Sequence, residues 1–249
     1  MEQPGYVVAV VGAGLAGLSF AAALMQESSR DHTFALCKVV VFEQSLVLDP
    51  GALRSLPLAR VGLKALHALE CPLVGAMFRQ ETDCIRREDL LKWFVSLLPA
   101  DAIHFGKSFR GFHVDGDQLF CRFQSMDAGN LQLEGPFDAV VAADGLRSNV
   151  RSECEAACEQ GPHRLRDLIL GGSILFLGDA RRAFRKERDL GLGRVFGGGN
   201  KAIEQGVQLA GSLIEAFDRA ARPVRGSTSL HQVAMVLQKA AAAMRWRRN

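Results

Sequence analysis

The sequence lacks the features that mark several common functional classes. Its six cysteines include no Cys-x-x-Cys pair, so the ligand spacings typical of structural zinc sites are absent. A net charge of +3 is too small to indicate binding to nucleic acid, and we expect no nucleic-acid partner. No internal repeat or low-complexity linker interrupts the 249 residues, which suffice for one large domain with a sizeable core.

The cysteines also bear on compartment and metal binding. They are scattered along the chain, at Cys37, Cys71, Cys84, Cys121, Cys154 and Cys158. Scattered reduced thiols are typical of intracellular proteins, so we expect a cytoplasmic protein. Cys154 and Cys158 fall on one face of a helix with His163 nearby, which leaves a metal site as a minor alternative. Because the usual zinc spacings are missing, we expect no bound metal.

Residues 6–25 carry no charge, and on length alone they suggest a membrane span. Glycines at positions 12, 14 and 17 interrupt this run, and no basic residue precedes it. We therefore expect neither a transmembrane segment nor a signal peptide. A buried strand over residues 7–11 followed by a helix over residues 15–27 explains the same hydrophobicity.

A second apolar strand, "CKVVVFEQ", follows a polar loop and ends at the acid Glu43. A strand, a helix and a second strand in this order predict an α/β fold with a parallel sheet, of the Rossmann-like type that binds FAD or NAD(P). Further patterns predict hairpin strands within residues 108–123. They also predict one buried strand that stops at Asp144 and a short strand over residues 174–177. Helices are expected over residues 53–69, 87–98, 202–221 and 230–246.

The turn between the first strand and the first helix has the spacing Gly12-x-Gly14-x-x-Gly17. In such a turn the first glycine permits a tight bend, the second lets a diphosphate approach the main chain, and the third lets helix and strand pack closely. The helix N-terminus adds free N–H groups and a partial positive charge. The expected cofactor contacts are Gly12, Ala13, Gly14, Leu15, Ala16 and Gly17. The alternative is a glycine-rich turn that only packs a helix.

Glu43 stands where such folds place an acid at the end of the second strand. Its carboxylate would accept hydrogen bonds from both hydroxyls of an adenosine ribose, and it disfavours a 2′-phosphate. NADP is therefore not expected in this first site, and Gln44 is expected beside the same ribose. The glycine turn and the acid together predict a dinucleotide site.

Three further stretches, "RREDLLKWF", "VVAADGLRSNVR" and "LFLGDA", occur in that order along the chain. Together with the glycine turn, the chain resembles the single-component FAD-dependent aromatic hydroxylases, a family of flavoprotein monooxygenases. The resemblance implies that Arg87 contacts FAD and that Asp144 and Gly145 lie beside its diphosphate. It also implies that Gly178 and Asp179 bind the ribityl chain.

The stretch "GGGN" before the helix at residues 202–221 extends the resemblance to the flavin ring. In the family, the residues matching Gly198, Gly199 and Asn200 approach the ring near its N1 and O2 atoms. A positive helix end there stabilises the negative charge of reduced flavin. The implied activity is NAD(P)H-dependent hydroxylation or epoxidation of a small organic substrate, with FAD as cofactor. No side chain is assigned as a catalytic acid or base.

The implied organisation is a single FAD-binding domain over residues 1–249. Within it, residues 1–50 form the dinucleotide-binding start, 51–135 helices and a small β insert, 136–200 the Asp-Gly and Gly-Asp motifs, and 201–249 C-terminal helices.

The chain departs from the family pattern in two places. Between Asp144 and Asp179 there is sequence for one short helix and a loop, so most of the sheet of the substrate domain is expected to be missing. After Ala180, arginines stand where the family has a histidine and a proline.

These departures leave three alternatives open. The chain is a non-catalytic or truncated relative that binds FAD or another nucleotide without a substrate pocket, or it is an NAD-dependent dehydrogenase with the same glycine turn. In the third alternative, the basic stretch over residues 181–194 docks an acidic partner or a membrane surface.

Overall fold

The computed structural model describes residues 6–30, 37–49, 54–80, 82–163, 165, 173–178, 180 and 198–221. Its centre is a five-stranded sheet in the order β10-β9-β1-β2-β5, with every neighbouring pair parallel. The strands are β1 (Tyr6–Val11), β2 (Cys37–Phe42), β5 (Ile103–His104), β9 (Ala139–Ala142) and β10 (Ile174–Phe176). The predicted α/β fold with a parallel sheet is therefore confirmed.

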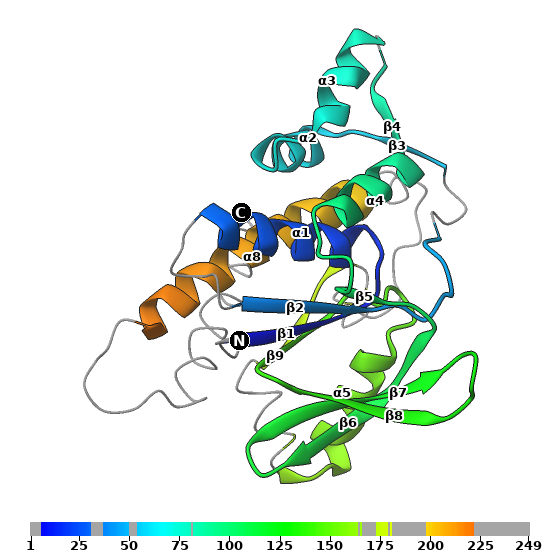
Figure 1. Cartoon of the computed structure of the whole chain (residues 1–249), viewed down its shortest axis with the longest axis vertical. Coiled ribbons are helices and arrows are strands. Elements are labelled where there is room, and N and C mark those ends of the chain that lie inside the picture. The colour runs from blue at the N-terminus through cyan, green and yellow to red at the C-terminus, as the bar shows by residue number, and fades with distance from the viewer. Residues whose placement is uncertain are drawn as a thin grey trace.

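The three central strands are valine-rich and almost wholly buried, because the sheet is covered on both faces (Figure 1). Side chains alternate between the faces along each strand, so β1 contributes to two separate cores. Val8 and Val10 belong to the core under the helices, and Ala9 and Val11 belong to the core on the opposite face.

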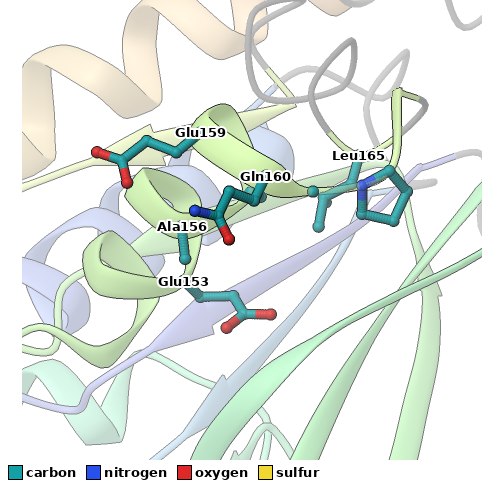
Figure 2. Close-up of a pocket in the computed structure, with 8 residues that line it drawn as sticks. Glu153, Ala156, Glu159, Gln160 and Leu165 are labelled. Carbon is teal, nitrogen blue, oxygen red and sulfur yellow. The ribbon is translucent and has the colours of Figure 1, made fainter.

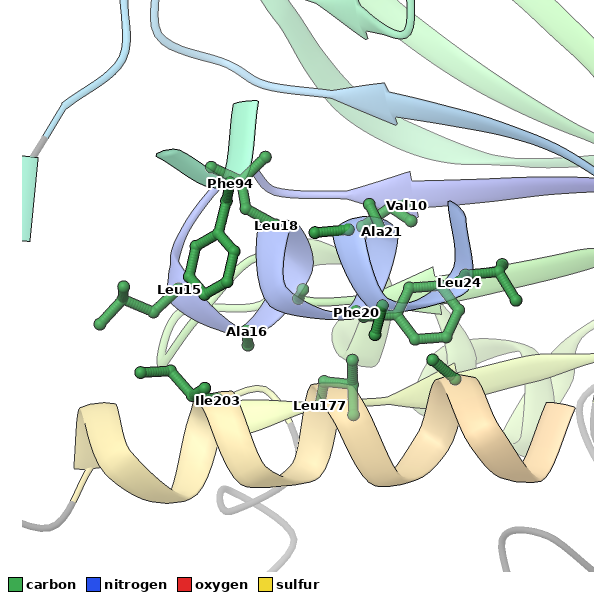
Figure 3. Packing of buried hydrophobic residues seen from close by; sticks show 14 of the residues in the cluster. Val10, Leu15, Ala16, Leu18, Phe20, Ala21, Leu24, Phe94, Leu177 and Ile203 are labelled. Atoms are coloured by element: carbon green, nitrogen blue, oxygen red, sulfur yellow. The ribbon is translucent and has the colours of Figure 1, made fainter. Parts of the chain in front are cut away.

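Helices cover the first face. The helix α1 (Leu15–Arg30) lies between the sheet and the long helix α8 (Gly198–Ala221), as Figure 3 shows. Gly206 of α8 allows this close approach, since a Cβ there would lie 2.8 Å from the backbone nitrogen of Phe20. Three shorter helices complete this side of the molecule, α2 (Arg60–Ala68), α3 (Pro72–Arg79) and α4 (Arg87–Ser96), with α2 packed against α8 and α4 against α1.

A three-stranded antiparallel sheet and one helix cover the second face. The strands are β6 (Lys107–Asp115), β7 (Gln118–Ser125) and β8 (Leu131–Phe137), and the helix is α5 (Asn149–Gln160). The two sheets meet where Phe42 of β2 stacks on Phe123 of β7, with ring centroids 4.2 Å apart. The predicted hairpin within residues 108–123 is thus confirmed, and β8 extends it by a third strand.

Two predicted helices begin at other residues than expected. The helix expected over residues 53–69 begins only at Arg60, so its first part was wrong. The preceding strand β3 (Ser55–Pro57) pairs antiparallel with β4 (Cys84–Arg86), a partner distant in sequence that overrides the local helical spacing. The helix expected from residue 202 begins at Gly198 and includes the last two glycines of the triple glycine. The helix expected over residues 230–246 lies outside the described residues.

Candidate functional site

The predicted glycine turn and two predicted acids meet at the carboxyl ends of β1, β2 and β9. There they border a cleft of about 220 Å³. Its lining residues are Val11, Gly12, Gly14, Phe42, Glu43, Gln44, Lys107, Phe109, Ala143, Asp144, Gly145 and Asn149. Ligands of open parallel sheets bind at this edge, because the loops that follow neighbouring strands converge there.

The three glycines of the turn have different surroundings. Gly12 has φ of +106°, and a Cβ on it would lie 2.6 Å from the carbonyl oxygen of Ala143. A Cβ on Gly17 would overlap the carbonyl oxygen of Gly12, which explains the close packing of α1 on β1. Gly14 has no atom within 4 Å of such a Cβ. The fold therefore requires the first and third glycines, whereas the second borders open space in the cleft.

Glu43 ties the end of β2 to the glycine turn. Its Oε2 accepts a hydrogen bond from the backbone N–H of Ala13 at 2.7 Å, and its Oε1 accepts one from Ser45 at 2.9 Å. A carboxylate has about four acceptor positions, so two remain for hydroxyl groups in the cleft. Gln44 follows as an exposed residue on the same wall.

Asp144 has one satisfied and one unsatisfied carboxylate oxygen. Its Oδ2 accepts a hydrogen bond from the backbone N–H of Val150 at 3.2 Å. Its Oδ1 is buried and has no hydrogen-bond partner within the described part of the chain. A buried acceptor without a partner costs free energy, so this atom, on a residue that lines the cleft, indicates a donor that the described residues do not supply. Gly145 beside it has φ of +82° and open space around its Cα.

Arg151 connects the Asp144-Gly145 loop to the segment after β10. Its guanidinium donates to the carbonyl oxygen of Leu146 at 3.1 Å and to that of Ala180 at 3.2 Å. Arg151 lies in the first turn of α5, and Ser148 caps that helix by accepting a hydrogen bond from the backbone N–H of Arg151 at 3.0 Å. The side chain of Arg151 therefore joins the Asp-Gly motif to the segment that carries the Gly-Asp motif.

Gly178 follows β10 with φ of +57° and packs against Ala16 of α1. Its backbone N–H donates to Oε1 of Gln205 at 3.1 Å. Asp179 lies outside the described residues, as does the arginine-rich stretch over residues 181–194. The predicted contact of Asp179 with a ribityl chain stays a prediction.

Asn200 has a role that the sequence did not predict. Its side chain is buried, and its Oδ1 accepts from the backbone N–H of Ala59 at 2.9 Å while its Nδ2 donates to the carbonyl oxygen of Pro57 at 2.8 Å. Gly199 packs closely on Leu56 of β3, since a Cβ on Gly199 would lie 2.7 Å from Cδ1 of Leu56. Both residues attach the start of α8 to the β3–α2 connection. Gly198 begins the helix, and the predicted contacts of all three with a flavin ring stay predictions.

Arg87 begins α4, and its backbone N–H donates to the carbonyl oxygen of Arg54 at 2.8 Å. It is not among the residues that line the cleft. Six lining residues were missed by the sequence interpretation, namely Val11, Phe42, Lys107, Phe109, Ala143 and Asn149. Lys107 and Phe109 are two positions apart on β6 and therefore share a face of the small sheet. This alternation follows from the predicted hairpin, but the sequence did not show which face borders the cleft.

The cysteines form no reactive or metal-binding group among the described residues. No cluster of three metal-ligating side chains occurs among these residues, and Cys154, Cys158 and His163 therefore do not form one. Burial raises the pKa of Cys37 to about 12 and that of Cys154 to about 12, so both thiols stay protonated at neutral pH. No helix in the described part of the chain is long and apolar enough to cross a membrane.

A second hollow, of about 310 Å³, lies at the C-terminal end of α5 (Figure 2). It shares no lining residue with the cleft. Its polar side chains include Glu153, Glu159 and Gln160, and Leu165 lies on the other side. It has no glycine turn and no unsatisfied buried atom among its lining residues. The cleft at the strand ends is therefore the better candidate site.

No protein-family model matches the chain, and no curated protein is similar to it in sequence. The chain is similar in structure to Klebsiella pneumoniae HpxO complexed with FAD and uric acid, with a TM-score of 0.57 and 14% identity over 97% of this chain and 84% of that one. It is also similar to a putative FAD-containing monooxygenase from Photorhabdus luminescens, with a TM-score of 0.58 and 13% identity over 96% and 95% of the two chains. A third similar structure is 2-methyl-3-hydroxypyridine-5-carboxylic acid oxygenase, with a TM-score of 0.57 and 14% identity over 98% and 88%. At these identities the likeness establishes the fold.

Proposed function

We propose that the chain is an FAD-binding oxidoreductase related to the NAD(P)H-dependent flavin monooxygenases. The observation that carries the proposal is the unsatisfied Oδ1 of Asp144, buried in the cleft that Gly14 and Glu43 also line. A ligand rich in hydroxyl groups supplies the donors that this atom and the remaining acceptor positions of Glu43 lack. The open space at Gly14 leaves room for the diphosphate that joins the two halves of such a ligand.

Different residues of the cleft bind different parts of the cofactor. Backbone N–H groups from Gly14 to Gly17 hold the diphosphate at the start of α1, and Glu43 holds the adenosine ribose. Asp144 and Gly145 lie beside the diphosphate, and Arg151 keeps their loop against the segment after β10. Bound FAD would supply the hydride-accepting and oxygen-reducing chemistry that the side chains of the protein lack. The chain's own part in this chemistry is to bind, orient and shield the cofactor.

The proposed reaction is hydroxylation or epoxidation of a small organic molecule, with NAD(P)H as the reductant. The ordered motifs of the sequence support this, and so do the structurally similar proteins, three of which are described as an FAD complex or as oxygenases. We further propose a single cofactor-binding domain over the whole chain, located in the cytoplasm.

Titration of the purified protein with FAD tests the proposal directly. We expect bound flavin to give a visible absorbance spectrum with a shifted, structured band near that of free flavin, and a dissociation constant in or below the micromolar range. Asp144→Ala should weaken this binding at least tenfold, while Asp115→Ala on the exposed β6–β7 turn is the matched control and should leave it unchanged. Wild-type protein that binds no FAD would contradict the proposal.

A non-catalytic relative that binds FAD or another nucleotide is the second candidate. The observation that favours it is the short chain between β9 and β10, in which the described residues include the helix α5 and no strand. This candidate predicts FAD binding without product formation. Oxidation of NAD(P)H matched mole for mole by hydroxylated product would contradict it. A dehydrogenase would instead bind NAD in the cleft, which competition between NAD and FAD would reveal.

A further inference from the structure

Lys107 is the one lysine that borders the cleft in the described part of the chain. It begins β6, and its backbone N–H donates to the carbonyl oxygen of Glu43 at 2.8 Å. This bond places it directly beside the acid that we assign to the adenosine ribose. Its side chain is only 17% exposed, so the ammonium group is largely removed from water.

Two residues of β8 hold the ammonium group in place. Its Nζ donates to Oε1 of Glu134 at 2.8 Å and to Oε1 of Gln132. Both acceptors lie on the face of the small sheet that also carries Phe123 and Cys121, the face turned toward the parallel sheet. A lysine has three N–H donors, so one remains for a ligand. Because the other two are fixed, the direction of the third is restricted.

The surrounding charges decide which kind of acceptor fits. Glu134 already compensates the charge of Lys107, and Glu43 adds a second carboxylate on the same wall of the cleft. A phosphate placed here would be repelled by both carboxylates. A neutral acceptor avoids this repulsion, and the purine attached to a ribose at Glu43 carries such acceptors in its ring nitrogens.

We propose that Lys107 is a specificity-determining residue that donates a hydrogen bond to a ring nitrogen of the cofactor's adenine. This inference rests on the proposed function, because it takes the adenosine half of FAD as the ligand. Glu134 and Gln132 are positioning residues that orient the donor and balance its charge. The cleft therefore selects a purine through a side chain in addition to its main-chain contacts.

Binding of FAD and ADP to Lys107→Met tests the inference. We expect affinity for both ligands to fall by roughly ten- to a hundredfold, because the charged hydrogen bond to the base is lost, whereas Glu134 and Gln132 lose their donor in the free and the bound protein alike. Lys92→Met is the matched control, since Lys92 forms a comparable ion pair with Glu88 at 2.7 Å on the exposed face of α4. That variant should bind both ligands as the wild type does.

Analogues of ADP with carbon in place of N1, N3 or N7 locate the contact. One of them should bind the wild type as weakly as ADP binds Lys107→Met, and it should lose nothing further on that variant. If all three analogues lose as much affinity on the variant as ADP does, the contact is not to the base and the inference is overturned.

Labelling of the wild-type protein covers the case in which Lys107→Met does not fold. Saturating FAD should slow acylation of Lys107 by an amine-reactive reagent at least fivefold, with Lys92 unaffected. Unchanged labelling of Lys107 in protein that binds FAD would overturn the inference while leaving the proposed function intact. Protein that binds neither FAD nor ADP would overturn the proposed function itself.

Discussion

The Oε2 atom of Glu43 accepts a hydrogen bond from the backbone N–H of Ala13 at 2.7 Å, although the residues are 30 positions apart. This bond joins the acid after β2 to the glycine turn after β1. The two parts of the dinucleotide signature are thus joined by a direct hydrogen bond within the protein.

Replacing Glu43 separates its two roles. Glu43→Gln keeps an oxygen acceptor for Ala13 but loses the charge and the acceptor for the N–H of Ser45, so we expect the free energy of unfolding to fall by about 1–2 kcal/mol. FAD affinity should fall about tenfold, since charged acceptors bind hydroxyls more strongly than neutral ones. Urea unfolding and FAD titration measure the two effects. Equal FAD affinity in variant and wild type would contradict the assignment of Glu43 to the ribose.

Asp144→Asn should have opposite effects on stability and binding. Without a cofactor, the free energy of unfolding should stay the same or rise by up to about 1 kcal/mol, because a buried carboxylate with an unsatisfied oxygen becomes neutral. FAD affinity should nevertheless fall at least fivefold. Thermal unfolding with and without FAD reports both quantities. A loss of stability equal in the two conditions would mean that Asp144 has only a structural role.

The three glycines of the turn should respond differently to alanine. Gly17→Ala places a Cβ against the carbonyl oxygen of Gly12, so we expect a loss of about 3 kcal/mol or more of stability, or failure to fold. Gly14→Ala meets no atom within 4 Å and should fold with nearly unchanged stability. It should still weaken FAD binding, because the new methyl group enters the space for the diphosphate. A Gly14→Ala protein with full FAD affinity would refute that placement.

Asn200→Ala should destabilise the connection between α8 and α2. Two hydrogen bonds to backbone groups of the β3–α2 connection are lost inside the protein, so we expect a loss of about 2–4 kcal/mol. Gln208→Ala on the exposed face of the same helix is the control and should change stability by less than about 0.5 kcal/mol. Chemical denaturation measures both. Similar effects of the two changes would show that Asn200 does not hold the connection.

The buried thiol of Cys37 should make stability fall at alkaline pH. Burial raises its pKa from 9.0 to about 12 in the folded protein, so between these values the unfolded chain loses the proton first. The contribution is therefore complete below pH 9 and declines as pH rises toward 12, by up to about 1.4 kcal/mol per unit. Cys37→Ala should show a smaller decline. Identical pH dependence of unfolding in both proteins would contradict this.

Local patterns in the sequence were enough to predict the first half of the site. The valine-rich strands, the glycine spacing and the acid Glu43 follow from residues close together in the chain, and the structure brings them to one sheet edge. The strand at residues 55–57 could not be predicted in this way, because its pairing partner lies at residues 84–86. The same holds for Lys107, whose partners on β8 become neighbours only when the small sheet forms.

Asn200 illustrates the division between sequence and tertiary structure. By itself the sequence determined a parallel α/β sheet with a glycine turn and an acid, since these depend on short-range periodicity and on backbone freedom at glycine. Only the tertiary structure decided that Asn200 would be buried against Pro57 and Ala59, because the acceptor and donor that it needs come from a distant part of the chain. Hydrogen bonds between remote segments leave no periodic pattern in the sequence, and so they appear only when the chain is folded.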